Sequence, residues 1–117
     1  MIKSFKDLVV WQKSFNLVQD VYAATEQLPQ SELYGLSSQI RRSAVSIPSN
    51  IAEGSKRSTS KDYIQFLRVA YGSSAELETQ LLLAKALYNI EVDDPLGLVE
   101  EIQKMLQSLI TKLITKT

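Results

Sequence analysis

The 117-residue sequence contains no cysteine and no histidine. Without cysteine there is no disulfide framework, no thiolate metal site and no catalytic thiol. Without histidine there is no Ser–His or Cys–His nucleophile pair, no imidazole zinc ligand and no Glu-x-x-His di-metal motif. Most routes to enzymatic chemistry are closed, so we expect a protein that is not an enzyme and needs no cofactor.

Long apolar runs are also missing. The apolar run near the start, Leu8-Val9-Val10-Trp11, is too short for the central region of a signal peptide. No stretch approaches the roughly 18 apolar residues that a membrane span needs. We therefore expect a cytoplasmic protein without membrane contact.

Glycine and proline are scarce, with four and three copies, and the strict alternation typical of strands is absent. Helical periodicity is present instead, in four segments: about 6–27, about 33–53, from Thr59 or Ser60 for about thirty residues, and from Asp94 onward. The stripes are Leu8, Trp11, Phe15, Val18 and Tyr22; Leu36, Ile40, Ala44, Ile47 and Ile51; Tyr63, Phe66, Ala70, Ser74, Leu77, Leu81, Ala84 and Tyr88; and Val99, Ile102, Leu106, Leu109 and Leu113. Short loops favour antiparallel neighbours. The prediction is one all-α domain over residues 1–117, an up-down-up-down four-helix bundle.

Several residues predict where these helices end. Pro48 interrupts the second stripe without changing its phase, which indicates one bent helix. Gly54 is suited to follow the end of that helix, and Thr59 to cap the next. Asp94 with Pro95 predicts an N-cap followed by the first helical position.

The apolar stripes are wider than a four-helix core requires. The surplus positions predict either a bundle that tolerates wide stripes or a subunit interface. They are Val45, Pro48, Ala52, Leu82, Ile110 and Ile114. Small residues at 70–75 predict close approach of another helix near Ser43 and Ala44, and Tyr34 and Tyr71 are the tyrosines most free to be exposed.

Thirteen basic and thirteen acidic side chains cancel, but they are unevenly distributed. Acidic residues dominate 76–101, whereas basic residues dominate 41–68, and such asymmetry can guide a partner. The basic side chains of that region form a predicted basic belt, which consists of Arg41, Arg42, Lys56, Arg57, Lys61 and Arg68.

The segment 54–61 holds hydroxyls and cations just before a helix N-terminus, a place receptive to phosphate, although a solvated loop with a glycine C-cap and a Ser/Thr N-cap is the favoured interpretation. Glu53 and Asp62 are interpretable as a carboxylate pair, but an ion pair between Glu53 and a nearby cation is the simpler interpretation. Arg42 lies on the polar face of its helix, whereas Arg41 lies on the apolar flank, where an interface or carboxylate contact is expected.

Three stretches carry a family resemblance: Leu8 to Lys13, Glu32 to Gly54 with its core Gln39-Ile40-Arg41-Arg42-Ser43-Ala44-Val45-Ser46-Ile47-Pro48-Ser49-Asn50-Ile51-Ala52-Glu53-Gly54, and Phe66 to Glu78. They closely resemble the signature of the bacterial four-helix-bundle family named after proteins encoded in intervening sequences of large-subunit ribosomal RNA genes. The resemblance implies a left-handed bundle, a homo-oligomeric ring, by analogy a pentamer, and similarity to the nucleic-acid-binding accessory protein of diversity-generating retroelements. It brings no catalytic residues.

Together the pattern and the resemblance select candidate contact residues for a partner or nucleic acid. They are Arg41, Arg42, Asn50, Glu53, Lys56, Arg57, Lys61 and Arg68. The leading hypothesis is a non-catalytic oligomeric adaptor that associates with RNA or a nucleoprotein. The alternatives are a protein scaffold whose belt serves subunit contacts, and an enzyme that uses carboxylates and a metal.

Overall fold

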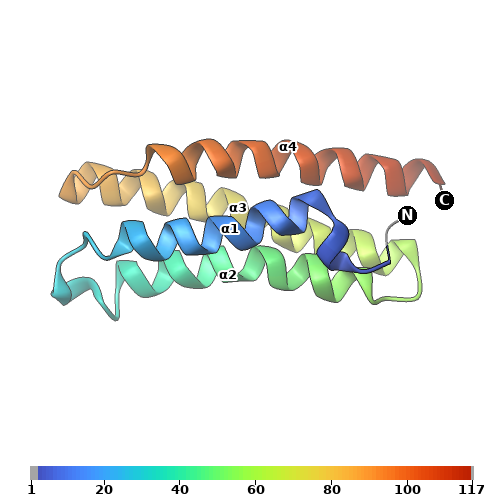
Figure 1. Ribbon diagram of the computed structural model, residues 1–117, viewed down its shortest axis with the longest axis horizontal. Helices are drawn as coiled ribbons and strands as arrows, with labels where there is room; N and C mark the ends of the chain where they lie inside the picture. The colour runs from blue at the N-terminus through green and yellow to red at the C-terminus, as the bar shows by residue number, and fades with distance from the viewer. Residues whose placement is uncertain (1–2, 117) are drawn as a thin grey trace.

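The computed structural model describes residues 3–116 and consists of four long α-helices (Figure 1). They are α1 (Val9–Thr25), α2 (Leu36–Ser55), α3 (Ser60–Tyr88) and α4 (Asp93–Lys116), with the short 3-10 helices η1 (Phe5–Asp7) and η2 (Gln30–Glu32) before α1 and α2. No strand occurs among these described residues, so the predicted all-α class is confirmed. None of the four helices is both long enough and apolar enough to cross a membrane, as far as residues 3–116 show.

The helices lie side by side along the 46 Å long axis of a body that is 22 by 21 Å across (Figure 1). Helices α1 and α3 each pack against both α2 and α4. Within the described part of the chain, α1 and α3 are not neighbours, and neither are α2 and α4. The bundle therefore has four side faces, and the face formed by α1 and α2 lies opposite the face formed by α3 and α4.

Capping interactions fix the helix ends. Ser4 and Asp7 form a reciprocal capping box around η1, and the Thr59 hydroxyl accepts a hydrogen bond from the Asp62 amide as α3 begins, as predicted. Helix α3 ends at Asn89, which adopts the left-handed conformation with φ 54°.

Two predicted helix ends are wrong. Gly54 lies inside α2, which continues to Ser55, because its missing Cβ allows α3 to approach rather than ending the helix. Helix α4 begins at Asp93, two residues before the predicted first helical position Pro95, because the Val92 carbonyl accepts the first hydrogen bond, from the Leu96 amide. Pro95 is tolerated there because the first amides of a helix have no intrahelical acceptor.

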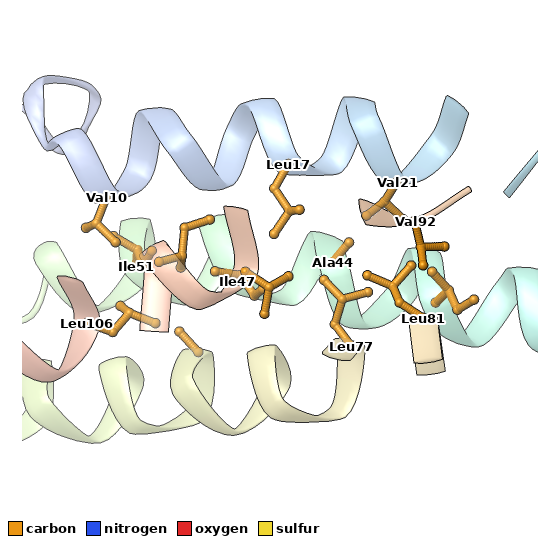
Figure 2. Close-up of a cluster of buried hydrophobic side chains, with 14 of the residues drawn as sticks. Val10, Leu17, Val21, Ala44, Ile47, Ile51, Leu77, Leu81, Val92 and Leu106 are labelled. Atoms are coloured by element: carbon orange, nitrogen blue, oxygen red, sulfur yellow. The ribbon is translucent and has the colours of Figure 1, made fainter. Parts of the chain in front are cut away.

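The core runs along the bundle axis and draws apolar side chains from all four helices (Figure 2). The predicted stripes of α2, α3 and α4 supply most of it. Fully buried members include Ile40, Ala44, Ile47, Ile51, Ala70, Leu77, Leu81, Ala84, Val99, Ile102 and Leu106.

The stripe predicted for α1 is only partly correct: Leu8, Trp11 and Val18 pack against the core, but a neighbouring stripe is the buried one. Its buried side chains are Val10, Ser14, Leu17, Val21, Ala24 and Thr25, whereas Phe15 is 51% and Tyr22 is 42% exposed. Two overlapping stripes satisfy helical spacing on this segment, and the one with smaller side chains faces the core. Phe15 and Tyr22 are left on the outer flank, where Phe15 packs against Trp11 and Tyr22 contacts Arg41.

Two surplus positions are in fact core residues. Pro48 and Ile110 are buried, so neither contributes to an outer apolar surface. Val45, Leu82 and Ile114 are 40%, 50% and 48% exposed, and Ala52 is half-buried. The surplus apolar surface is therefore real but smaller than predicted.

Small residues allow α2 and α3 to pack closely, as predicted. Ser73 and Ser74 of α3 are buried, as are Ser43 and Ala44 of α2. The seam is joined by a 2.8 Å hydrogen bond between the hydroxyls of Ser46 and Ser73.

Candidate interaction surfaces

Arg41 and Arg42 point in different directions from α2. The Arg41 Nε donates a 2.8 Å hydrogen bond to the Thr25 hydroxyl, and its guanidinium lies 4.5 Å from the centre of the Tyr22 ring. This cation–π contact joins α1 to α2. Arg42 is exposed and lies toward α3 instead. The predicted interface contact of Arg41 is thus made between two helices of the same chain.

Asn50 takes part in a polar network inside the bundle. Its amide donates to the Ser46 carbonyl at 2.8 Å and to the Ser46 hydroxyl at 3.0 Å, and that hydroxyl is bonded to Ser73. These contacts tie α2 to α3 close to Pro48. The amide is therefore committed to helix packing in the free protein.

Glu53 forms an ion pair with Arg57, one turn later, at 2.8 Å. The Arg57 guanidinium also lies 4.6 Å from the centre of the Phe66 ring. Asp62 belongs to the capped first turn of α3. Within residues 3–116 there is no group of three or more side chains able to hold a metal ion.

An aromatic row lies on the outer side of the α1–α2 face. Trp11 stands at its centre, with ring centroids 5.2 Å from Phe5 and 5.0 Å from Phe15. Tyr22 continues the row toward the end of α1, and the exposed Val45 projects from α2. We call Phe5, Trp11, Phe15, Tyr22 and Val45 the aromatic face.

The α3–α4 face, on the opposite side, contains an open groove of about 900 Å³. Tyr71, 40% exposed, lines it from α3, and Gln103, Lys104 and Gln107 line it from α4. The exposed Leu82 belongs to the same side of α3 as Tyr71. Tyr34 is the most exposed tyrosine, at 94%, as predicted, whereas Tyr71 is no more exposed than Tyr22, at 42%.

Charge is separated along the long axis of the bundle. The start of η1, the end of α4 and the α2–α3 connection share one end, which we call the basic end; the other two connections share the acidic end (Figure 1). The basic half, which is the half of the bundle next to the basic end, carries Lys3, Lys6, Lys56, Arg57, Lys61, Arg68, Lys104, Lys112 and Lys116 against Asp7, Glu53 and Asp62. The acidic half carries Asp20, Glu26, Glu32, Glu76, Glu78, Glu91, Asp93, Asp94 and Glu100 against Arg41, Arg42 and Lys85. Lys13 and Glu101 lie together near the middle and form a 2.7 Å ion pair. A chain without net charge is thus strongly bipolar.

The predicted basic belt is divided by this arrangement. Lys56, Arg57, Lys61 and Arg68 lie in the basic half, whereas Arg41 and Arg42 lie in the acidic half. The basic half also contains exposed lysines outside the predicted basic belt, namely Lys6, Lys104, Lys112 and Lys116. The order of the helices could have predicted these lysines, because it places the start of η1 and the end of α4 near the α2–α3 connection.

Hydrogen bonds hold the loops of the acidic end together. Gln27 and Glu91 exchange two bonds between side-chain amide and backbone, of 3.3 and 3.1 Å. The Tyr88 hydroxyl donates to the Glu32 carboxylate. That bond, helped by the Leu36 amide, lowers the pKa of Glu32, and the same partnership raises the pKa of Tyr88.

The family model described as "23S rRNA-intervening sequence protein" matches residues 6–110. A solved structure of a protein of unknown function from the S23 ribosomal protein family of Bacteroides thetaiotaomicron is similar, with a TM-score of 0.80 and 28% identity. The alignment covers 87% of this chain and 98% of that one. No curated protein matches the chain significantly.

Proposed function

The chain belongs to the family of 23S rRNA-intervening sequence proteins, and we propose that it is a non-catalytic, homo-oligomeric adaptor that associates with RNA or a nucleoprotein. The observation that carries this proposal is the separation of charge between the basic and acidic ends. A polyanion is attracted to clustered cations and repelled by acidic side chains. One end of the bundle is therefore suited to RNA although the chain has no net charge.

Self-association is supported by two different surfaces on opposite sides of the bundle, one aromatic and the other a groove lined mostly by polar side chains. The aromatic face is a ridge with Phe15 and Tyr22 exposed, and the α3–α4 face offers a groove beside Tyr71 and Leu82. A head-to-tail contact between copies needs two such unlike patches, and it closes into a ring when the rotation permits. We propose that the aromatic face of one copy packs on the α3–α4 face of the next, in a pentamer of left-handed, up-down-up-down bundles.

Such a ring strengthens the charge argument. If neighbouring copies share one axial direction, their basic ends gather on one rim and their acidic ends on the other. A single bundle offers few cations to a nucleic acid, whereas a rim repeats Lys56, Lys61 and Arg68 in every copy. The family description, which refers to 23S rRNA, supports a cytoplasmic setting for this partner.

Several candidate residues are engaged by contacts within the chain and form no catalytic arrangement. Glu53 is paired with Arg57, Asn50 with Ser46, and Arg41 with Thr25 and the Tyr22 ring. The sequence supplies no histidine or cysteine for nucleophilic chemistry. We therefore assign Arg41, Asn50 and Glu53 to contacts within the chain, and the exposed cations of the basic end to partner contact.

A salt titration of RNA retention tests the proposal. Purified protein is passed over immobilised single-stranded RNA of mixed sequence at increasing salt concentration. We expect weak retention, insensitive to sequence, that falls linearly on a logarithmic plot because released counterions drive the binding. Absence of retention at low salt would reject RNA association.

That negative result would favour a protein scaffold, for which the acidic end offers a specific feature. Tyr34 is 94% and Leu87 is 64% exposed there, beside a concentration of carboxylates. Large exposed side chains of this kind are typical of contact sites between proteins. In that case the basic end serves contacts between copies.

A further inference from the structure

A polar pocket of about 270 Å³ lies between α2 and α3, on a side face that the proposed ring contact leaves free. Gln39, Arg42 and Ser43 line it from α2, and Ser73, Glu76 and Gln80 line it from α3. All of these side chains are polar or charged. All of these lining residues except Gln80 lie within the two longest stretches of the family resemblance, 32–54 and 66–78. Gln80 lies two residues beyond the second stretch.

The side chain of Gln80 is buried, and one of its polar atoms makes no hydrogen bond within the described chain. Its residue is only 9% exposed, and its Oε1 is buried without a hydrogen-bond partner within the described chain. Buried side-chain oxygens are nearly always bonded, because desolvation without a partner is costly. By contrast, Glu78, on the side of α3 that faces α4, accepts a 3.0 Å hydrogen bond from the side-chain amide of Gln103. Gln80 therefore has an unused acceptor beside the pocket, which a turn of its terminal amide makes available to a bound molecule.

Two opposite charges face the same pocket from different helices. Arg42 of α2 and Glu76 of α3 both line it, yet within residues 3–116 they form no ion pair with each other or with any other side chain. The guanidinium presents a fork of N–H donors that matches a carboxylate, and the carboxylate of Glu76 accepts from an ammonium. A ligand that carries both a carboxylate and an ammonium can pair with Arg42 and Glu76 at the same time.

Size and lining narrow the class of ligand. The volume is just below the range of roughly 300–1,000 Å³ that drug-sized sites occupy, which suits a small molecule. No aromatic side chain lines the pocket, so a nucleobase would lack stacking worth about 1–3 kcal/mol. Hydroxyls and amides on both walls match a small, strongly hydrogen-bonding molecule.

We propose that this pocket binds a free amino acid as its zwitterion. The ligand carboxylate lies on the guanidinium of Arg42, and its ammonium lies on the carboxylate of Glu76. The Gln80 amide turns about its terminal torsion, which has broad preferences, to accept a hydrogen bond from the ligand. The site is independent of the basic end, so it does not depend on RNA binding.

Calorimetric titration of the full-length protein with each of the twenty common amino acids tests the proposal. At least one should bind at millimolar concentration or below. Its carboxyl amide and its N-acetyl derivative should each bind roughly tenfold more weakly or worse, because each lacks one of the two charges. If none of the twenty binds, or if both derivatives bind as well as the parent, the proposal is wrong.

Variants separate this site from a non-specific effect. Arg42→Gln and Glu76→Gln should each weaken binding by roughly tenfold or more. The matched controls Arg68→Gln and Glu78→Gln remove the same charges outside the pocket and should leave the affinity unchanged. All four side chains lie at the surface or partly so, and circular dichroism checks that each variant is folded. Equal binding by the pocket variants and the controls would overturn the assignment.

Discussion

Gly54 of α2 lies directly against Phe66 of α3. A Cβ added at Gly54 would stand 2.7 Å from the Cβ of Phe66 and 3.0 Å from the Cδ1 of Tyr63. Carbon atoms in proteins do not approach so closely without displacement, and the Phe66 Cβ is fixed to a helix backbone. This contact sets how near the two helices come at the basic end.

Replacing Gly54 by alanine should therefore destabilise the protein. Alanine gains up to about 1 kcal/mol in helix propensity, but overpacking of a close seam costs about 1–3 kcal/mol, so the net change is a loss. Gly72 is the matched control, because it lies inside α3 with nothing within 4 Å of an added Cβ. Gly72→Ala should stabilise by about 0.5–1 kcal/mol. Urea unfolding measures both, and a shift of the same sign in the two variants would contradict the close contact.

The Ser46–Ser73 hydrogen bond predicts coupling between α2 and α3. Ser46→Ala removes the partner of the Ser73 hydroxyl and one of the two acceptors of the Asn50 amide, and we expect it to cost about 1–2 kcal/mol. Ser73→Ala should cost less, because Asn50 keeps its bonds. A double-mutant cycle on unfolding free energies should give a coupling of about 0.5 kcal/mol or more, and additive losses would show that the bond is absent.

The Tyr88–Glu32 hydrogen bond predicts a pH dependence of stability. Because the pKa of Glu32 is lowered from its ordinary value of 4.5, its ionised form favours the folded state. This contribution is present above that value and is lost as pH falls through the lowered pKa. Unfolding free energy measured from pH 6 downward should fall less steeply in Glu32→Gln than in the wild type. Parallel curves would contradict the shift; Glu26→Gln at an exposed position serves as the control.

The aromatic face predicts self-association. The wild type should exceed the 13.1 kDa chain mass in light scattering at micromolar concentration. Phe15→Glu places a charge on the proposed contact and should shift the protein toward the monomer, whereas Asn16→Glu at the adjacent exposed position should not. A monomeric wild type across a dilution series would show that the exposed rings are not a subunit contact.

The sequence was sufficient to predict α2 and α4 with their core stripes, because each carries one dominant apolar face. For α3 it was sufficient only in part, since Tyr88 was placed on the stripe and is 38% exposed, whereas Leu67 was not and is fully buried. It was insufficient for α1, where the stripe of Trp11 and Phe15 and the stripe of Leu17 and Val21 fit helical spacing equally well. Which of the two faces inward depends on how closely the neighbouring helices approach. That distance is set by small residues on other helices, such as Ala44.

The candidate site was predictable only in part. The cluster of basic residues at 56–68 is visible in the sequence itself. Lys6 and Lys112 come close to that cluster only through the packing of the helices. Conversely, Arg41 and Asn50 belong to the family signature, but their side chains form hydrogen bonds within the chain, to Thr25 and Ser46. The pocket at Gln80 depends on side chains from two helices, which no single segment reveals.

The most direct test of the adaptor proposal compares RNA retention by two charge-reversal variants at one low salt concentration. Lys6→Glu, Lys61→Glu and Arg68→Glu together reverse exposed charges of the basic end, and Arg42→Glu with Lys85→Glu reverses charges of the acidic half. We predict that the first variant loses retention while keeping the helicity and mass of the wild type, and that the second binds as the wild type does. Equal retention by both variants, or no retention by the wild type, would contradict RNA association through the basic end.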